Sequence, residues 1–265
     1  MTTPFTYDFG YSWWITWGQV VPILVFGVIA ALALWRRWNR WIIVACGLVV
    51  VWGIAALIVI HGLFRLNLPL PPASERFLAS GNGRVVDIGA GSGRATIGLM
   101  LAKPAVTVTA VDIYSGYFGI DGNTPERLMN NARIAGVADR ASAKIGDARE
   151  LPFADGEFDG AISVAAIDHV PRRDIPKAVA EAARVLKPGG EFLLTIVNVD
   201  AWVWFASPPM AHHPPAIPDR WRGMLTSAGF DILEEGRQPG GIYFLSRKTT
   251  RPVTRQPPPS SRSSS

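Results

Sequence analysis

Residues 84–94 read Arg-Val-Val-Asp-Ile-Gly-Ala-Gly-Ser-Gly-Arg, and this stretch decides the fold. Its first half is rich in β-branched residues and predicts a buried strand, which runs into a loop of alternate glycines and then into a helix. Glycines let the backbone turn sharply and approach a ligand closely, and the start of a helix offers free N–H groups. The stretch therefore predicts a ligand site where strand, loop and helix meet.

The spacing of the glycines disfavours two common ligands of such loops. A dinucleotide loop has its third glycine three residues after the second, but Arg94 occupies that position and Gly93 comes one residue early. A Walker phosphate loop needs a Gly-Lys-Ser/Thr sequence, which does not follow here. A nicotinamide-dependent oxidoreductase is therefore the weaker interpretation.

The remaining pattern, an acidic residue followed by alternate glycines from Asp87 to Gly93, resembles the first motif of class I S-adenosylmethionine-dependent methyltransferases. Residues 146–153 with 158–159, and residues 184–190, resemble later motifs of the same family. The similarity covers residues 84–247 and is closest to the branch, methyltransferase type 11, that includes quinone-biosynthesis enzymes. It implies S-adenosyl-L-methionine as the cofactor.

Candidate cofactor-binding residues follow from the loop, the next strand and the resemblance. Asp112 ends the second predicted strand, where a carboxylate can accept hydrogen bonds from both ribose hydroxyls of an adenosyl ligand. The resemblance implies that Ile113 neighbours the same ligand and that Asp147 and Ala148 meet the adenine edge. The complete predicted set is Asp87, Gly89, Ala90, Gly91, Gly93, Asp112, Ile113, Asp147 and Ala148.

Strand and helix patterns alternate from Arg84 onward, which predicts an α/β domain with a parallel sheet covered by helices. The predicted strands are 84–88, 106–112, 141–145, 158–164 and 191–198, and the predicted helices are 93–102, 124–136 and 175–187. The resemblance implies a doubly wound, Rossmann-like, seven-stranded sheet, mostly parallel. Its last strand, near 241–247, runs antiparallel beside a strand near 230–235.

Two apolar runs precede this domain. Residues 13–34 and 41–63 are about as long as the roughly 20 residues that a membrane-spanning helix needs, and the link between them holds Arg36, Arg37 and Arg40. Tryptophans near the ends of both runs suit the membrane interface. We expect two transmembrane helices forming an anchor over residues 1–66, a linker over 67–83, a methyltransferase domain over 84–248 and a disordered tail over 249–265.

Two arguments about the orientation of the domain in the membrane oppose each other. The positive-inside rule would place the arginine link in the cytoplasm and the domain outside. S-adenosylmethionine is a cytosolic metabolite, however, and Arg65, Arg76 and Arg84 partly balance the charge bias. We therefore expect a membrane protein with its catalytic domain on the cytosolic side.

Charge and cysteine content exclude other classes of function. The formal charge is +5, but six basic residues lie after residue 235 with no acid among them, and the rest of the chain is nearly neutral. Nucleic acid is therefore not an expected partner. One cysteine, Cys46, and four histidines without regular ligand spacing predict no metal site.

The methyl acceptor is the least determined part of the prediction. Asp168 and His169, after the fourth strand, are candidates for a general base, as are Tyr117, His212 and His213. A helix-capping Asp168 with a structural His169 is the favoured alternative. The aromatic and proline-rich residues 202–218 predict an acceptor lid. A membrane anchor favours a lipid-like or other small hydrophobic acceptor; the alternatives are a membrane-protein acceptor and a non-catalytic, membrane-tethered module that binds an adenosyl ligand.

Overall fold

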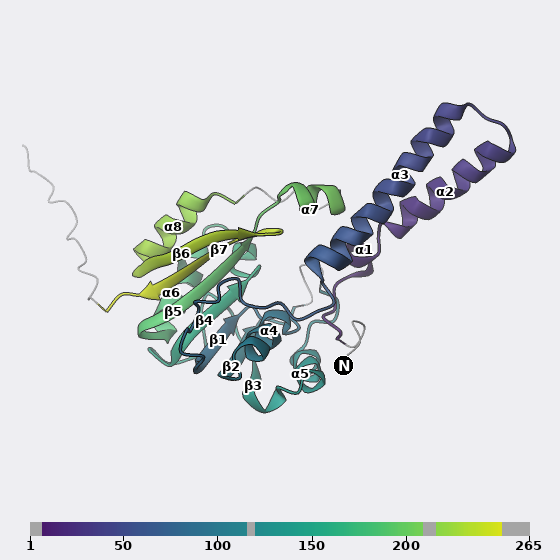
Figure 1. Cartoon of the computed structure of the whole chain (residues 1–265). Helices are drawn as coiled ribbons and strands as arrows, with labels where there is room; N and C mark the ends of the chain where they lie inside the picture. The colour runs from purple at the N-terminus through teal and green to yellow at the C-terminus, as the bar shows by residue number, and fades with distance from the viewer. Residues whose placement is uncertain (1–6, 116–119, 209–215, 251–265) are drawn as a thin grey trace, which may run out of the picture.

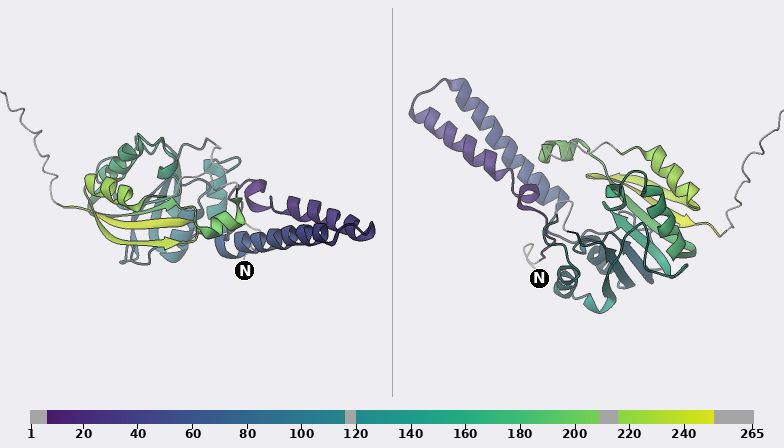
Figure 2. Two further views of the ribbon diagram at one scale, coloured as in Figure 1. Left: turned by 90° about the horizontal axis from the view of Figure 1, so that it is seen from above. Right: turned by 180° about the vertical axis from the view of Figure 1, so that it is seen from behind.

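The computed structural model describes residues 7–115, 120–208 and 216–250. It contains an α/β domain and, on the N-terminal side, a pair of long helices that project from the domain (Figure 1). Two further views show that these helices stand clear of the sheet along most of their length (Figure 2). Most of the predicted tail, from residue 251 onward, lies outside the described residues.

The domain is built on a seven-stranded sheet with the strand order β3-β2-β1-β4-β5-β7-β6. β1 to β5 run parallel, and β7 is antiparallel to both β5 and β6. The predicted sheet, with its antiparallel last strand between the two preceding ones, is confirmed. The strands are Asn82–Ile88 (β1), Ala105–Asp112 (β2), Ala141–Ile145 (β3), Phe158–Val164 (β4), Leu186–Val197 (β5), Phe230–Gln238 (β6) and Gly241–Lys248 (β7).

Helices cover both faces of the sheet because successive side chains of a strand point to opposite sides. Val85 of β1 packs in one buried cluster with residues of α4 (Arg94–Ala102) and α5 (Pro125–Ile134). Its neighbour Val86 packs in a second cluster with residues of α6 (Ile175–Val185) and α8 (Pro218–Ser227). The central strand is therefore buried on both sides, and the carboxyl ends of β1 and β2 are held firmly in place.

The helix predicted over 175–187 ends two residues early, at Val185, and β5 begins at Leu186 instead of near residue 191. Pro188 is the physical reason, because a proline ring disfavours helical backbone at the residue before it. The three residues Pro188, Gly189 and Gly190 form a bulge, since Phe158 of β4 pairs with Leu186 while Gly160 pairs with Glu191. The proline and glycines thus end the helix, as expected, but they belong to β5 and not to the connection before it.

The predicted linker, residues 67–83, is part of the folded domain. Phe77 has none of its surface exposed and packs in the same cluster as Val85. The backbone N–H of Leu78 donates to Glu191 Oε2 at 2.7 Å. The backbone of Leu70 lies so close to α4 that a Cβ on Gly98 would be 1.8 Å from its oxygen. The chain between the hairpin and the sheet is therefore fixed by packing.

The projecting helices are α2 (Val20–Trp35) and α3 (Arg40–Ile58), and a π-helical turn, η1 (Val59–Phe64), continues α3. Among the described residues, one helix, Arg40–Phe64 with 25 residues, is long and apolar enough to cross a membrane. The other apolar helix, α2, has 16 residues. The second predicted span therefore matches a continuous helix in length, and the first is shorter than expected.

The first predicted span, residues 13–34, is interrupted. A short helix, α1 (Trp13–Thr16), is separated from α2 by three residues, Trp17, Gly18 and Gln19. Gly18 lies against the preceding turn, where a Cβ would be 2.4 Å from the Trp14 oxygen, and glycine is a poor helix former. The prediction of one uninterrupted helix from residue 13 is therefore wrong.

Candidate functional site

The glycine loop after β1 has the conformation that its sequence predicts. Gly89 and Gly91 have positive φ angles of 75° and 54°, which side chains other than glycine rarely adopt. A Cβ on Gly89 would lie 2.2 Å from the Cβ of Ala166, so the loop also passes closer to the segment after β4 than any side chain would allow. The loop thus leaves its backbone open to a ligand at the start of α4.

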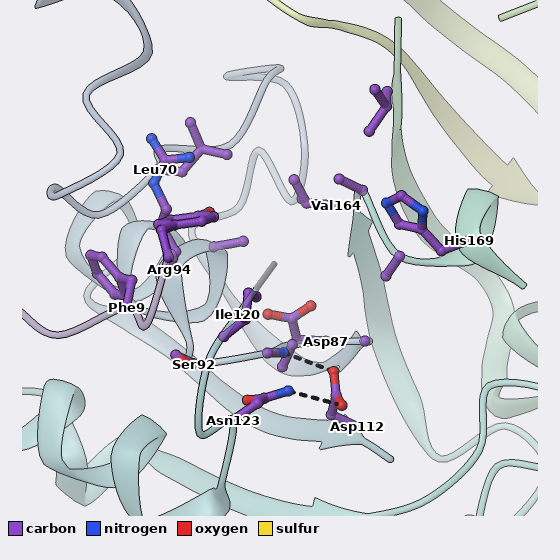
Figure 3. Close-up of a pocket in the computed structure, with 18 of the residues that line it drawn as sticks. Phe9, Leu70, Asp87, Ser92, Arg94, Asp112, Ile120, Asn123, Val164 and His169 are labelled. Atoms are coloured by element: carbon purple, nitrogen blue, oxygen red, sulfur yellow. Dashed lines mark hydrogen bonds between the residues drawn. The ribbon is translucent and has the colours of Figure 1, made fainter. Parts of the chain in front are cut away.

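Asp112, at the end of β2, faces this loop directly (Figure 3). Its Oδ2 accepts a hydrogen bond from the Gly91 N–H at 2.9 Å, and its Oδ1 accepts from the Tyr114 N–H at 2.7 Å and from Asn123 Nδ2 at 3.3 Å. Three donors therefore fix the carboxylate beside the loop.

Asp87 is almost completely buried beneath the loop. Its Oδ2 accepts a hydrogen bond from Thr96 Oγ1 at 2.5 Å, while its buried Oδ1 has no partner among the described residues. Burial, with a smaller contribution from the nearby charge of Asp112, raises the pKa of this carboxyl to about 7 against the opposing hydrogen bonds from Thr96. A cationic group of a ligand at this position would be stabilised by the carboxylate.

Asp147 stands at the opposite end of the same edge, after β3. Its carboxylate is held by Arg149, with Nη2 to Oδ2 at 2.6 Å and the Arg149 backbone N–H to Oδ1 at 2.8 Å. These hydrogen bonds keep the pKa of Asp147 below its usual range. Arg149 also reaches Asp174 at 3.3 Å, so it joins the loop after β3 to the start of α6.

A cavity of about 450 Å³ connects these groups at the carboxyl ends of the strands (Figure 3). Of the nine predicted cofactor-binding residues, it is lined by all except Gly93, namely Asp87, Gly89, Ala90, Gly91, Asp112, Ile113, Asp147 and Ala148. Gly93 is the residue before α4 and has a φ of 86°, and a Cβ there would be 2.8 Å from Leu128. Glycine is therefore needed here so that the loop can pack against Leu128.

The two candidate bases lie differently with respect to the cavity. His169 lines it, whereas Asp168 does not and instead accepts a hydrogen bond from the Val197 N–H at 2.8 Å, which ties the turn after β4 to the end of β5. Tyr117, His212 and His213 lie outside the described residues. Within the described ranges, no cluster of three His, Cys, Asp or Glu side chains could hold a metal ion.

Several cavity residues come from parts of the chain that sequence patterns did not assign to the site. Phe9 and Tyr11 precede the hairpin, and Ile60 and Phe64 end it. Asn131 of α5 holds the N-terminal segment in place: its Nδ2 donates to the Asp8 oxygen at 2.7 Å and to the Ser92 oxygen at 3.0 Å. No local pattern signals this contact, which joins residues 123 positions apart.

Comparison with known proteins finds a family that matches the part of the chain carrying this geometry. The family described as "Methyltransferase domain" matches residues 85–190, which contain the glycine loop, Asp112 and Asp147. Residues 85–190 form a methyltransferase domain. It is a domain of the S-adenosylmethionine-dependent class, and its cofactor is S-adenosyl-L-methionine.

Two curated relatives and one solved structure illustrate the similarity. The methyltransferase GfsG of Streptomyces halstedii is 29% identical over 169 residues, covering 60% of this chain and 57% of GfsG. The ubiquinone/menaquinone biosynthesis C-methyltransferase UbiE of Methylobacterium nodulans is 36% identical over 119 residues, covering 44% of this chain and 43% of UbiE. The chain thus spans less than two thirds of the length of either relative.

The fold of the methyltransferase domain is also found in a solved structure, an S-adenosylmethionine-dependent methyltransferase from Methanosarcina mazei. It superposes with a TM-score of 0.52 at 22% identity and covers 69% of this chain and all of its own. At this identity the likeness concerns the fold alone. It agrees with the strand order and with the antiparallel β7.

Arg94 has a structural explanation in this methyltransferase domain. Its guanidinium donates to the backbone oxygens of Phe64 and Leu68, at 2.7 and 2.9 Å. A glycine at this position, as in a dinucleotide loop, would leave those carbonyl groups without this donor. The residue that disfavours nicotinamide binding thus links the cofactor loop to the end of the hairpin.

The cavity fits the groups of S-adenosylmethionine on its own chemistry. The unpartnered Asp87 Oδ1 faces a place for a cation, the Gly89 and Gly91 backbone leaves room that a Cβ would fill, and Asp112 offers acceptors for two hydroxyl groups. Ala148 adds an apolar surface for a ring next to Asp147. The order along the sheet edge, from β3 through β2 to β1, gives an extended site for an extended ligand.

Proposed function

We propose that the protein is a membrane-anchored S-adenosylmethionine-dependent methyltransferase that acts on a small hydrophobic acceptor. One observation carries the proposal: a continuous cavity is lined by the cofactor residues Asp87 and Asp112 at one end and by apolar side chains from the base of the hairpin, Ile60 and Phe64, at the other. The same segment that would anchor the chain therefore also contributes to the cavity.

The bound cofactor would supply a methyl group already activated by a sulfonium, so the protein's part is mainly to position the acceptor and exclude water. Asp112 and Asp147 would hold the ribose and adenine, and Asp87 would favour the cationic end. The apolar wall would exclude water from the acceptor. His169 lines the cavity and would accept a proton where the acceptor is a hydroxyl group or an acidic carbon.

The relative UbiE supports the class of acceptor. It is a C-methyltransferase of ubiquinone and menaquinone biosynthesis. The ring of a quinone precursor is largely apolar, and the apolar end of the cavity suits a group of that kind. A lipid-like or quinone-like acceptor is therefore the proposed class.

The sizes of the buried and exposed side chains of the hairpin support membrane anchoring. The buried residues between its two helices are small, namely Ala33, Cys46, Gly53 and Ala56. Large apolar side chains point outward instead: Leu24, Leu48 and Val51 are 62%, 66% and 64% exposed. Small residues at the contact and large apolar residues outside are typical of helices packed in lipid.

The ends of the hairpin carry further features of a membrane segment. Trp35, Trp38 and Trp41 are exposed at its tip, beside Arg36 and Arg40, and a second group of exposed tryptophans, Trp13, Trp14 and Trp17, lies at its base. Aromatic rings favour the two interfaces of a bilayer, and arginines can extend their charge to the headgroups. Lipid is therefore the proposed surrounding of the hairpin.

The orientation of the hairpin is part of the proposal. Asp8 contacts Asn131 of the domain, so the segment before the hairpin lies on the same side as the methyltransferase domain, and the tip lies on the far side. Because the cofactor is a cytosolic metabolite, we place the domain in the cytosol. In a Cys46→Ser background, a membrane-impermeant maleimide applied to intact cells should label Arg36→Cys but not Asp139→Cys; the reverse pattern would overturn this orientation.

The main experiment uses the full chain reconstituted in lipid nanodiscs. Calorimetric titration should show binding of S-adenosylmethionine and S-adenosylhomocysteine, and transfer of a tritiated methyl group should label a membrane lipid extract. Asp112→Ala should weaken both ligands by about 10- to 100-fold, because two charge-assisted hydrogen bonds are lost. The exposed Asp139→Ala is the matched control. Binding without transfer would favour the non-catalytic adenosyl-binding module, and absence of binding would overturn the proposal altogether.

A further inference from the structure

The strand order places the two ends of the cavity on different parts of the sheet. The cofactor residues Asp112 and Asp147 follow β2 and β3, on one side of β1. The remaining cavity residues follow β4, β5 and the β6–β7 turn, on the other side, and include Val164, Val197 and Gly240. An extended ligand that begins at β3 therefore points its far end at this second group.

This second part of the cavity has a wall from the hairpin. The π-helical turn η1 carries Ile60, which is 2% exposed, and Phe64. The Phe64 ring packs on the turn between β6 and β7, where a Cβ on Gly240 would be 3.1 Å from the ring. Ile15, from the segment before α2, lines the cavity beside them. Both ends of the hairpin thus close the same apolar space.

A short helix, α7 (Ala201–Ala206), forms the adjoining wall. The Asp200 side chain caps the start of α7, where Oδ1 accepts from the Trp202 N–H at 2.9 Å. Its Oδ2 accepts from the Gly240 N–H at 2.9 Å and so ties α7 to the turn between β6 and β7. Val203 and Ala206 line the cavity. On the other face of α7, Trp202 and Trp204 are 52% and 60% exposed.

Contacts with the hairpin set the place of α7 relative to the proposed membrane. Gln19 Nε2 donates to the Ala206 oxygen at 2.6 Å, and Trp52 Nε1 donates to the Phe205 oxygen at 3.0 Å. From Gln19 to the tip of the hairpin, α2 extends for 16 residues, about 24 Å. This length is less than the roughly 30 Å of a hydrocarbon core. With the hairpin inserted, the exposed aromatic face of α7 comes to the near headgroup region.

We propose that Ile60, Phe64, Val203 and Ala206 form the acceptor subsite, and that an apolar acceptor enters it from the bilayer, between α7 and the base of the hairpin. The inference rests on the proposed function and adds a place and a route for the acceptor. α7 separates lipid on its tryptophan face from the cavity on its Val203 face, so the acceptor moves between two apolar surroundings without crossing water. The hairpin is then part of the substrate site as well as an anchor.

Photolabelling tests the subsite without relying on turnover. The full chain is placed in nanodiscs that contain a phosphatidylcholine with a diazirine at the end of one acyl chain, irradiated, and mapped by mass spectrometry. Adducts are expected on the inward residues Ile60, Phe64 and Val203 as well as on the outward Trp202 and Trp204. Adducts confined to outward residues of α7 and the hairpin would overturn the inference.

Two variants change the size of the subsite in opposite directions. Ala206→Phe should fill it, lowering methyl transfer by about tenfold or more and removing the inward adducts, because small changes of volume in a hydrophobic pocket discriminate at this level. Phe64→Ala should enlarge it and increase the inward adducts. The control is Leu48→Phe, on the outward face of α3 and away from the cavity, which should leave both readouts unchanged.

Cofactor titration of the same samples separates this inference from the proposed function. Unchanged binding of S-adenosylmethionine in Ala206→Phe and Phe64→Ala would show that both variants are folded. If wild-type protein binds the cofactor and transfers methyl groups but Ala206→Phe does so equally well, the subsite is wrong and the function stands. If wild-type protein neither binds nor transfers, the proposed function itself fails.

Discussion

A hydrogen bond of 2.7 Å from Arg94 Nη2 to the Phe64 backbone oxygen joins the first residue of α4 to the last residue of the hairpin. The same guanidinium donates through Nε to Leu68, and the backbone oxygen of Arg94 accepts from the Leu70 N–H at 3.0 Å. One arginine therefore satisfies carbonyl groups at the end of a helix, where a cation is also favoured by the helix dipole.

Replacing this arginine should loosen the hairpin from the methyltransferase domain. Arg94→Met keeps the length of the side chain but leaves the carbonyl groups of Phe64 and Leu68 without their donor, at a cost of about 1.5–3 kcal/mol for a charged hydrogen bond. Hydrogen exchange should become faster at the amides of residues 65–70 in the full chain. Arg133→Met, an exposed arginine on α5, serves as the control; equal exchange in the two variants would contradict the linking role.

Gly89 and Gly81 form a matched pair for testing the glycine loop. Both have φ near 75°, but a Cβ on Gly89 would lie 2.2 Å from Ala166, while a Cβ on Gly81 would meet nothing within 4 Å. Gly81→Ala should cost about 1–2 kcal/mol in unfolding free energy from backbone strain alone and keep cofactor affinity. Gly89→Ala should cost more and lose cofactor binding. Urea unfolding and calorimetry measure both; similar results for the two would argue against a close approach at Gly89.

The buried carboxyl of Asp87 should make the stability of the protein depend on pH. Its pKa is raised from 3.8 to about 7, so between these values the folded state holds a proton that the unfolded state has lost. The contribution of Asp87 to the unfolding free energy should therefore be full below about pH 4, fall by about 1.4 kcal/mol per pH unit as pH rises toward 7, and level off above it. Urea unfolding from pH 5 to 8 measures this slope. Asp87→Asn should abolish it, whereas Asp139→Asn should not.

Ionisation of Asp87 should also change the affinities for S-adenosylmethionine and S-adenosylhomocysteine to different extents. S-adenosylmethionine carries a sulfonium charge that S-adenosylhomocysteine lacks, and a nearby carboxylate stabilises a cation. Raising the pH from 6 to 8, through the pKa of about 7, should therefore strengthen S-adenosylmethionine binding more than S-adenosylhomocysteine binding. Calorimetric titrations of both ligands check this. An affinity ratio that stays constant with pH, or that changes equally in Asp87→Asn, would count against a role for this charge.

The parts of the fold that the sequence predicted are those encoded locally. Residues 84–94 carry the strand, loop and helix start within one short stretch, and Asp112 follows from the end of the next strand; together they supply five of the eight predicted cofactor residues that line the cavity. The other three, Ile113, Asp147 and Ala148, were implied by the family resemblance. The end of α6 differs from the prediction because Pro188 disfavours helical backbone at the residue before it. Lys187 therefore lies in the strand rather than in the helix.

The parts that the sequence did not predict depend on contacts between distant residues. Phe77 lies in a stretch whose prolines and glycines are typical of a linker, yet it is fully buried in the core. Phe9 reaches the cavity because Asn131 binds the backbone of Asp8, and Ile60 reaches it because the hairpin folds back onto the domain. Periodicity and composition describe single segments and carry no information about such packing.

The outward face of the hairpin provides the last prediction, which concerns membrane association. Leu48 on α3 is 66% exposed and lies well along the projecting helix, so Leu48→Arg would place a charge in lipid, at a cost of about 2.5–3.5 kcal/mol. The variant should shift from the floating to the soluble fraction in liposome flotation while still binding S-adenosylmethionine. Leu101→Arg is the control, because Leu101 is 48% exposed on α4 of the domain. If Leu48→Arg floats like the wild type, Leu48 does not lie in lipid; if the wild type itself stays in the soluble fraction, lipid does not hold the hairpin.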